Sequence, residues 1–249
     1  MKPNTELPVE RVMPYASDES KRKQVAKTFD TIAPRYDRLN RVLSLGLDTG
    51  WRRSALNLFA DAPPARLLDV ATGTGDFALL AAHVLPQSAI VGVDLSEGML
   101  AAGRRKVAAA GLEARITLQT GDAQSLPFPD GAFDAATVAF GVRNFESLAS
   151  GLAEIGRVLK SGGRIVILEL SSPRTFPLRP LHRLYLRYWI PLMGRLLTGH
   201  TREYAYLPAS IAQVPQDEAM LELLSNAGFT GCRFIRYAGG ICTCYTGIR

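Results

Sequence analysis

Short apolar runs alternate with helix-forming stretches through the middle of the chain. The runs predict β-strands at 66–71, 89–94, 115–120, 133–139 and 163–170. Helical patterns between them cover 75–85, 96–110 and 146–160. Because such alternation winds helices over both faces of a sheet, it predicts an α/β fold with a Rossmann-like, doubly wound and mostly parallel sheet.

Helical patterns also precede the first predicted strand. From Ser17, a candidate N-cap residue, one helix would place four large side chains on a single face: Val25, Phe29, Ile32 and Tyr36. Two shorter helices are expected at 39–45 and 48–59, whereas residues 1–17 are expected to be frayed. Residues 1–62 are therefore predicted to form an N-terminal helical cap, separated by two prolines from a main domain at 63–249.

The alternation stops at residues 172–215, which are rich in proline, aromatic residues and arginine. We predict a helical insertion in this region. After it, a helix at 216–226 and two strands at 229–237 and 240–247 close the chain.

The most informative motif follows the first predicted strand. Residues 71–76 (ATGTGD) form a glycine turn that leads directly into a helix. Missing Cβ atoms let a ligand approach the backbone closely, so the turn predicts a nucleotide-type cofactor site. The residues expected to contact the cofactor here are Thr72, Gly73, Thr74 and Gly75. Nineteen residues after Gly75 the second strand ends in Asp94 and Leu95, where such folds place an acid on ribose hydroxyls.

The same turn also matches the G-x-G-x-x-G/A pattern of NAD-binding proteins at residues 73–78. Asp76 argues against NAD, because a carboxylate at the helix N-terminus would repel a pyrophosphate. A cofactor without phosphate, such as S-adenosylmethionine, tolerates that charge. The chain also lacks a tyrosine followed four residues later by lysine, the proton-relay pair of short-chain dehydrogenases.

Two further strand ends extend the predicted cofactor site. Asp122 follows the third strand and can accept a hydrogen bond from an adenine amino group, and Ala123 leaves room for the ring. Ala139 and Phe140 end the fourth strand. This order resembles the class I S-adenosylmethionine-dependent methyltransferases, with Ala71 in place of the first glycine of their usual trio.

Both acidic residues also have simpler structural interpretations. Asp94 could cap the helix that follows it, although Ser96 is an alternative cap. Asp122 could serve only as a turn residue. The common order of the glycine turn and both acids favours a cofactor site over these alternatives.

Motifs outside the cofactor site resemble the menaquinone/ubiquinone biosynthesis C-methyltransferases. They are residues 25–40 (VAKTFDTIAPRYDRLN), 43–46 (LSLG), 51–52 (WR), 140–144 (FGVRN), 157–163 (RVLKSGG), 168–171 (LELS), 204–211 (YAYLPASI) and 237–249. The resemblance covers roughly residues 21–249 and implies methyl transfer to a ring carbon of a polyprenylated quinol. One departure is Ala139, where some members carry serine, so its cofactor contact would involve only backbone or van der Waals atoms.

Methylation of carbon needs a nucleophilic ring carbon, which a hydroquinone provides when a hydroxyl loses or shares its proton. The site therefore needs a proton acceptor or an anion stabiliser beside an apolar slot. Among residues that match the family's motifs, we expect Arg143 to stabilise the phenolate and Asn144 to position a hydroxyl. Tyr36 would orient the ring or relay the proton, with Asp37 and His200 as reserve bases. Alternatively, Asn144 caps the next helix and Tyr36 is a buried packing residue.

The net charge of +6 is concentrated in one segment. Residues 171–202 contain six arginines and no acidic residue. A helix at 180–189 would carry apolar and aromatic side chains on one face and arginines on another. Such a helix can lie on an anionic membrane that holds a polyprenyl substrate, so residues 174–202 are predicted to contact the membrane reversibly. The alternative is a lid helix packed on the core with a solvated basic face.

The remaining composition limits the location and the chemistry. No apolar stretch approaches the roughly 18 residues of a membrane span, and the N-terminus has no signal-peptide core. The three cysteines are an odd number crowded at the C-terminus, which argues against a disulfide framework and predicts a cytoplasmic protein. With the arginine-rich segment, the expected location is cytoplasmic and peripheral on the inner membrane face. The scattered histidines give little support for a metal site.

Several rival functions stay open at this point. Basic charge also suits a nucleic-acid methyltransferase, but the Asn/Asp-Pro-Pro-aromatic run of amino-group methylators is absent and no cysteine precedes Cys232. A binding-only protein and an NAD oxidoreductase are the other candidates. Demethylmenaquinol is the expected substrate, with the benzoquinol intermediate of ubiquinone biosynthesis as the alternative; prenyl length and oligomeric state are open.

Overall fold

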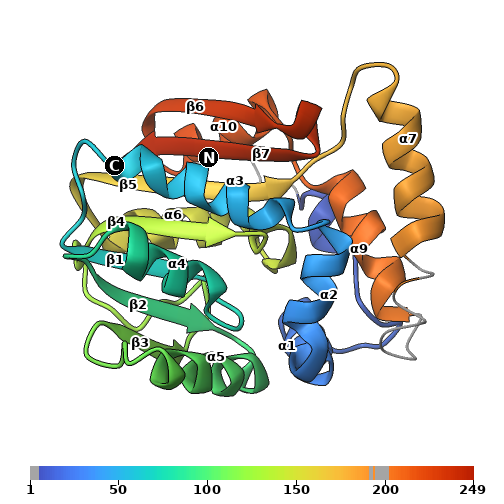
Figure 1. Ribbon diagram of the computed structural model, residues 1–249. Coiled ribbons are helices and arrows are strands. Elements are labelled where there is room, and N and C mark those ends of the chain that lie inside the picture. The colour runs from blue at the N-terminus through green and yellow to red at the C-terminus, as the bar shows by residue number, and fades with distance from the viewer. Residues whose placement is uncertain (1–5, 191–192, 194–201) are drawn as a thin grey trace.

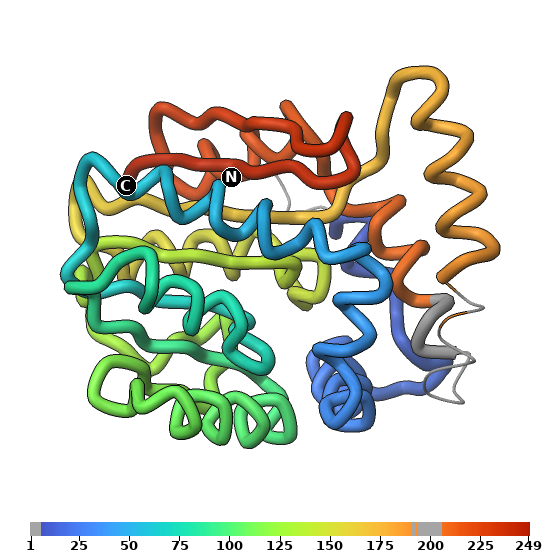
Figure 2. Tube along the Cα trace, in the orientation of Figure 1, coloured from blue at the N-terminus to red at the C-terminus, as the bar shows by residue number. Residues whose placement is uncertain are grey.

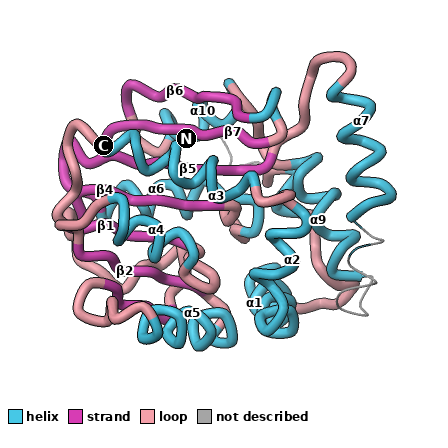
Figure 3. Tube along the Cα trace, in the orientation of Figure 1, coloured by secondary structure: helices cyan, strands magenta, loops and turns pink. Residues whose placement is uncertain are grey.

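A seven-stranded sheet with the order β3-β2-β1-β4-β5-β7-β6 forms the centre of the protein. The computed structural model describes residues 6–190, 193 and 202–249. The strands are β1 (Arg66–Val70), β2 (Ala89–Asp94), β3 (Ile116–Thr120), β4 (Phe133–Ala139), β5 (Leu159–Leu170), β6 (Thr230–Tyr237) and β7 (Cys242–Ile248). β1 to β5 pair in parallel, and β7 lies antiparallel between β5 and β6. The predicted doubly wound, mostly parallel sheet is confirmed (Figure 1, Figure 3).

Helices cover both faces of this sheet. One face carries α3 (Leu47–Leu56), α4 (Asp76–Val84) and α5 (Glu97–Ala109), and the other carries α6 (Leu148–Val158) and α10 (Glu218–Asn226). Successive strand residues point to opposite layers, so Leu67 packs with α3 and α4 whereas Leu68 packs with α6 and α10. The apolar runs of the sequence are therefore strands that are buried on both faces.

Four more helices gather beyond the carboxyl ends of the parallel strands (Figure 1). They are α1 (Lys21–Ile32), α2 (Tyr36–Leu43), α7 (Leu178–Leu184), which continues into the π-helix η5 (Tyr185–Trp189), and α9 (Arg202–Gln213). The Cα trace shows that these segments, although far apart in sequence, lie together at the edge of the sheet formed by the carboxyl ends of the parallel strands (Figure 2). Open α/β sheets bind ligands at this edge, where the strand order reverses, here between β1 and β4.

The predicted start of the first long helix was wrong. α1 begins at Lys21, and its N-cap is Ser20, whose Oγ accepts a hydrogen bond from the backbone of Lys23 at 3.5 Å. Ser17 lies outside the helix, and its carbonyl accepts from the Gln24 side chain at 3.2 Å. Both serines offer the same capping chemistry, and only the path of the preceding chain selects between them.

The segment expected to be frayed contains an ordered 3-10 turn, η1 (Pro8–Arg11). Val9 is 1% exposed within the core, and Glu10 accepts a hydrogen bond of 2.7 Å from the first backbone N–H of α6. Lys21 donates to the carbonyls of Val9 at 2.7 Å and Arg143 at 3.0 Å, and burial lowers the pKa of its amine to about 8. One turn leaves no periodic pattern in the sequence, so only these long-range contacts reveal its order.

The insertion begins with α7 and η5, as the helical pattern predicts. Its apolar face is not buried: Leu181, Leu184 and Tyr188 are 57%, 53% and 61% exposed. Tyr185 is half-buried, and its hydroxyl donates to the Leu43 carbonyl of α2. Within the part of the chain that the structure describes, no helix is long and apolar enough to cross a membrane.

Candidate active site

The glycine turn between β1 and α4 adopts left-handed backbone conformations at three residues. φ is +54° at Ala71, +58° at Gly73 and +76° at Gly75. Glycine accepts such angles without strain, whereas Ala71 pays a steric cost for its Cβ. The same Cβ explains Gly141, because a Cβ added there would lie 2.6 Å from that of Ala71. Because Gly141 has no side chain, the chain after β4 can pass close to the glycine turn at Ala71.

Asp94 ties this turn to the end of β2. Its carboxylate accepts hydrogen bonds from the backbone N–H groups of Gly73 at 2.8 Å and Ser96 at 2.9 Å. Burial raises the pKa of Asp94, and these N–H donors oppose that rise. Ser96, not Asp94, caps α5, since its Oγ accepts from Met99 N at 3.1 Å. The capping interpretation of Asp94 was therefore wrong.

A cavity of about 60 Å³ lies over the turn, and we call it the small cavity. Nine of the predicted site residues line it: Tyr36, Gly73, Asp94, Leu95, Asp122, Ala123, Ala139, Phe140 and Asn144. The side chains of α1 that close it are Arg22, Val25 and Phe29. Arg22 forms an ion pair with Asp122 at 3.0 Å, and Asp122 also accepts from the backbone of Gln124 at 2.9 Å. Asp122 thus shapes its turn and faces the cavity at the same time.

Three predicted contacts do not line the small cavity: Thr72, Thr74 and Gly75. Thr72 donates its hydroxyl to the buried Asp69 of β1 at 2.6 Å, and Thr137 of β4 donates to the same carboxylate at 2.8 Å. Burial raises the pKa of Asp69 to about 6. Thr74 donates to Asp37 at 2.5 Å. The Thr72 and Thr74 hydroxyls therefore anchor the turn to β1 and α2 through hydrogen bonds, outside the lining of the small cavity.

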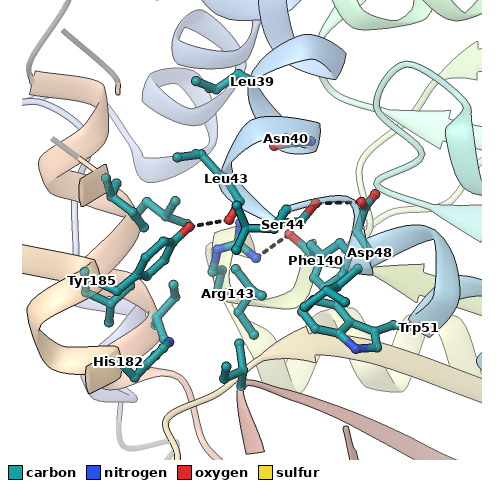
Figure 4. Close-up of a pocket in the computed structure, with 18 of the residues that line it drawn as sticks. Leu39, Asn40, Leu43, Ser44, Asp48, Trp51, Phe140, Arg143, His182 and Tyr185 are labelled. Atoms are coloured by element: carbon teal, nitrogen blue, oxygen red, sulfur yellow. Dashed lines mark hydrogen bonds between the residues drawn. The ribbon is translucent and has the colours of Figure 1, made fainter. Parts of the chain in front are cut away.

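A second, larger cavity of about 330 Å³ adjoins the first, and we call it the apolar cavity. It is enclosed by α1, α2 and α3 on one side and by α7, η5 and α9 on the other. Apolar and aromatic side chains dominate its lining, among them Leu39, Leu43, Trp51, Leu178, Leu186 and Ile190. Figure 4 shows Tyr185 and His182 facing residues of α2 and Trp51 across this space. Within it, the Ser44 hydroxyl donates to Asp48 at 2.7 Å.

The two cavities meet at three aromatic residues, since Phe29, Tyr36 and Phe140 line both. Phe29 and Tyr36 pack edge to face with ring centroids 5.9 Å apart. Burial raises the pKa of the Tyr36 phenol, so it stays protonated near neutral pH. Phe140 has a φ of +60°, an uncommon conformation for a residue with a side chain. A ligand in either cavity would contact this junction.

Arg143 lies beside the junction in a buried ion pair. Its Nη1 bonds to Glu169 of β5 and to the Phe140 carbonyl, both at 2.6 Å. Arg143 is 6% exposed and Glu169 2% exposed. Its Nε is buried without a partner, and the residue lines the apolar cavity. Desolvation lowers the pKa of the Arg143 guanidinium, but the charge and hydrogen bond of Glu169, together with Tyr36 and Tyr206, raise it above its ordinary value.

Asn144 does not cap the next helix, so that alternative was wrong. Ser147 is the N-cap of α6, and its Oγ accepts from Ser150 N at 3.3 Å. Asn144 instead accepts a hydrogen bond of 3.0 Å from the hydroxyl of Tyr206 on α9. Burial raises the pKa of that phenol. Asn144 is thus a polar group held at the edge of the small cavity.

Of the two reserve bases, only Asp37 belongs to the described residues, and it does not lie at the junction. Asp37 lines neither cavity and bonds to Lys106 of α5 at 2.7 Å. His200 lies outside the described residues, as does Arg195. Lys106 also pairs with Asp76, so the carboxylate that argued against NAD is neutralised. The structure thereby weakens that argument.

Sequence analysis missed Glu169, Tyr206 and a catalytic candidate, Arg52. Arg52 from α3 is 8% exposed, lines the apolar cavity and lies with its guanidinium carbon 5.5 Å from the centroid of the Phe140 ring. The only signal in the sequence was the resemblance at residues 51–52, which assigned no role. Glu169 falls inside an apolar run. A single acidic residue in such a run is expected to be buried with a basic or hydrogen-bonding partner, but the sequence does not say which residue that partner is.

The chain matches the model of the ubiE/COQ5 methyltransferase family over residues 17–249. It belongs to that family. A demethylmenaquinone methyltransferase of Bacteroides fragilis is 48% identical over 239 residues, which cover 96% of this chain and 98% of the relative. A demethylmenaquinone methyltransferase of Thermus thermophilus is 44% identical over 89% of this chain and 99% of its own length. A ubiquinone/menaquinone biosynthesis C-methyltransferase of Geotalea uraniireducens is 43% identical over 91% of this chain and 97% of its own.

Solved structures show the same fold. A SAM-dependent methyltransferase of Thermotoga maritima, a possible histamine N-methyltransferase, has a TM-score of 0.62 at 20% identity, covering 89% of this chain and 98% of its own. A structure of PigF with SAH has a TM-score of 0.62 at 19% identity, covering 94% of this chain and 63% of its own. The predicted class I fold is therefore confirmed. The family membership makes this protein a methyltransferase, confirms S-adenosylmethionine as its cofactor and removes the NAD alternative.

Proposed function

We propose that this family member methylates a ring carbon of a polyprenylated quinol, demethylmenaquinol, with S-adenosylmethionine as the methyl donor. The observation that carries the proposal is the apolar cavity of about 330 Å³ that opens onto the small cavity at Tyr36 and Phe140. A quinol ring with an isoprenoid tail matches such a lining, because each buried CH₂ contributes about 0.8 kcal/mol. The names of the relatives from Bacteroides and Thermus support the same substrate.

The residues of the small cavity fit the proposed donor. Gly73 presents its backbone with no side chain, Asp94 would hold the ribose, and Asp122 with Ala123 would hold the adenine. When bound, S-adenosylmethionine supplies an electrophilic methyl group on a sulfonium centre. The half-buried carboxylate of Asp94, which has no ion-pair partner among the described residues, also favours a positively charged donor.

The residues at the junction would act on the quinol. Tyr36 would orient the ring by its edge, and its phenol would relay a proton through water. Arg143 would present its free Nε to a ring oxygen as negative charge develops, and Asn144, held by Tyr206, would position a hydroxyl. Glu169 fixes the Arg143 side chain for this role.

Incubation with methyl-labelled S-adenosylmethionine tests the function directly. We expect the label in the lipid extract when reduced demethylmenaquinone is present, and at least 100-fold less in Arg143→Ala or Asn144→Ala variants whose cofactor affinity is unchanged. Exclusive labelling of the benzoquinol precursor would move the assignment to ubiquinone synthesis. Full turnover in both variants would remove their proposed roles.

We further propose that the mouth of the apolar cavity rests on an anionic membrane. Leu45 in the loop between α2 and α3, Leu47 at the start of α3 and Leu181 of α7 line the cavity and are 72%, 49% and 57% exposed. Arg183 and Arg187, beside them on α7 and η5, are exposed and suit anionic headgroups. Arg174 is less available to bind a lipid headgroup, because it forms an ion pair with Asp217 at 2.7 Å.

Vesicle flotation tests the membrane contact. Leu181→Glu should reduce binding to anionic vesicles by about 10- to 100-fold, since one leucine contributes roughly 1.5–3 kcal/mol when buried. Ile235→Glu is the matched control, because Ile235 is a 42% exposed apolar residue on β6 that lines neither cavity. Equal flotation with neutral and anionic vesicles, or an equal loss in both variants, would contradict the proposal.

A further inference from the structure

Arg52 is a buried guanidinium that makes no hydrogen bond to the described residues. It is 8% exposed, and its Nε is buried without a partner. Arginine stays protonated and carries five N–H donors. Because a buried cation with unsatisfied donors is costly, its geometry calls for a ligand oxygen.

Two carboxylates lie near Arg52 but do not occupy its donors. Asp48 is 3.6 Å from Nε, and Asp76 is 4.0 Å from Nη1. Each already has a closer partner, since Asp48 accepts from the Ser44 hydroxyl at 2.7 Å and Asp76 is bonded by Lys106. The two acids balance the charge of Arg52 while its N–H groups remain free.

The position of Arg52 links these donors to the reaction. Its guanidinium faces the ring of Phe140 at 5.5 Å, and Phe140 lines both cavities. Arg143 is the other guanidinium at the apolar cavity, but Glu169 and the Phe140 carbonyl already take its Nη1. Arg52 therefore has the larger set of free donors at the junction.

We propose that Arg52 binds a ring oxygen of the quinol and stabilises the negative charge on it during methyl transfer. This inference rests on the proposed function. The proton of the bound hydroxyl first leaves to water, and the ring carbon of the resulting phenolate bonds to the methyl carbon. The S–CH₃ bond breaks with its electron pair left on sulfur. The hydrogen of that ring carbon then leaves as a proton to water while a proton returns to the ring oxygen, so the reaction releases one proton in all. Arg52 cannot accept this proton, because it is always charged. Its contribution is electrostatic.

Titratable groups face Arg52 from five elements. They are Tyr36 on α2, Asp48 on α3, Asp69 on β1, Asp76 on α4 and Cys242 on β7. Burial raises the pKa of the Tyr36 phenol and of the Cys242 thiol, so both are neutral at pH 9 and below. Burial raises the pKa of Asp69 to about 6, so it is ionised above pH 7. Between pH 7 and 9 these three groups keep their charge. The Lys21 amine, with a pKa of about 8, titrates in this window in the wild type and in the variants alike, so the difference between an Arg52 variant and the wild type across the window reports the quinol.

The test compares Arg52→Gln and Arg52→Lys with Arg53→Gln, an exposed neighbour on the same helix. Methyl transfer to demethylmenaquinol is measured from pH 7 to 9, together with the affinity for S-adenosylhomocysteine. R52Q should lose about 100- to 1,000-fold in kcat at pH 7. The loss should shrink toward pH 9, because a free phenol with a pKa near ~10 increasingly ionises unaided. R52K should recover part of the rate, R53Q should match the wild type, and all should bind S-adenosylhomocysteine normally.

A bound probe gives a readout besides activity. The pKa of 2-naphthol in the apolar cavity, followed by the absorbance of its anion, should be lower in the wild type and R53Q than in R52Q. If R52Q does not fold, R52K provides the same comparison with a smaller shift. An equal naphthol pKa in all proteins, or an R52Q deficit that is the same at pH 7 and pH 9, would overturn the inference. If no protein methylates a quinol while Arg52 still lowers the naphthol pKa, the proposed function fails and phenol binding by Arg52 stands.

Discussion

Replacing Glu169 with glutamine is expected to lower the free energy of unfolding by about 3–5 kcal/mol. Glu169 and Arg143 are 2% and 6% exposed, and their side chains meet at 2.6 Å. Removing the carboxylate charge leaves the Arg143 cation buried and unpaired, which is more costly than losing an exposed pair. Urea denaturation measures the change. Glu97→Gln is the control, because Glu97 pairs with Arg104 at the surface and should have little effect.

A paired replacement separates stability from chemistry at this position. Glu169→Leu combined with Arg143→Met should regain most of the stability lost in E169Q, because an apolar pair of similar volume is often tolerated in place of a buried ion pair. Methyl transfer should remain at least 100-fold reduced, since no guanidinium is left at that place. An E169Q protein as stable as the wild type would show that the pair does not balance a buried charge.

Replacing Asp94 with asparagine is expected to weaken S-adenosylhomocysteine binding by about 100-fold. The carboxylate accepts from Gly73 N at 2.8 Å and from Ser96 N at 2.9 Å, and an amide can satisfy only one such donor with its oxygen. The charge-assisted contact to the ribose is lost as well, at roughly 1.5–3 kcal/mol. Isothermal titration calorimetry measures the affinity.

Asp130→Asn is the matched control for the loss of a carboxylate, because its side chain is 81% exposed and lines neither cavity of the junction. It should bind S-adenosylhomocysteine as the wild type does. If D94N also bound normally with an unchanged unfolding midpoint, the glycine turn would not depend on Asp94.

The sheet and many residues that line the small cavity could be predicted because their signals are local. Each strand is a short apolar run, and the turn at 71–76 carries its conformation in its own glycines. Asp94 and Asp122 were found because the carboxyl ends of parallel strands meet at one edge of the sheet. The family's motifs then pointed to Tyr36, Arg143 and Asn144, whose chemical roles remain proposals.

The parts that sequence analysis missed depend on contacts between distant segments. In the sequence Glu10 does not stand out from the other polar residues of the terminus. Only the fold places it where it accepts a hydrogen bond from the first N–H of α6. Arg52 is one of two adjacent arginines, and only the packing of α3 against the sheet buries it while leaving Arg53 exposed. A capping role for Asn144 stayed open as an alternative because its partner Tyr206 lies 62 residues away. Such pairings are set by tertiary structure, which a periodic pattern does not encode.

The proposed function requires donor and quinol to occupy adjoining cavities that meet at Tyr36 and Phe140. A crystal structure with S-adenosylhomocysteine and a short-chain demethylmenaquinol would locate both ligands. We expect the sulfur beside Gly73, the naphthol ring between Tyr36 and Phe140, a ring oxygen on the Arg52 guanidinium and the isoprenoid tail along α2 and α7. A quinol ring bound elsewhere, with the apolar cavity empty, would contradict it.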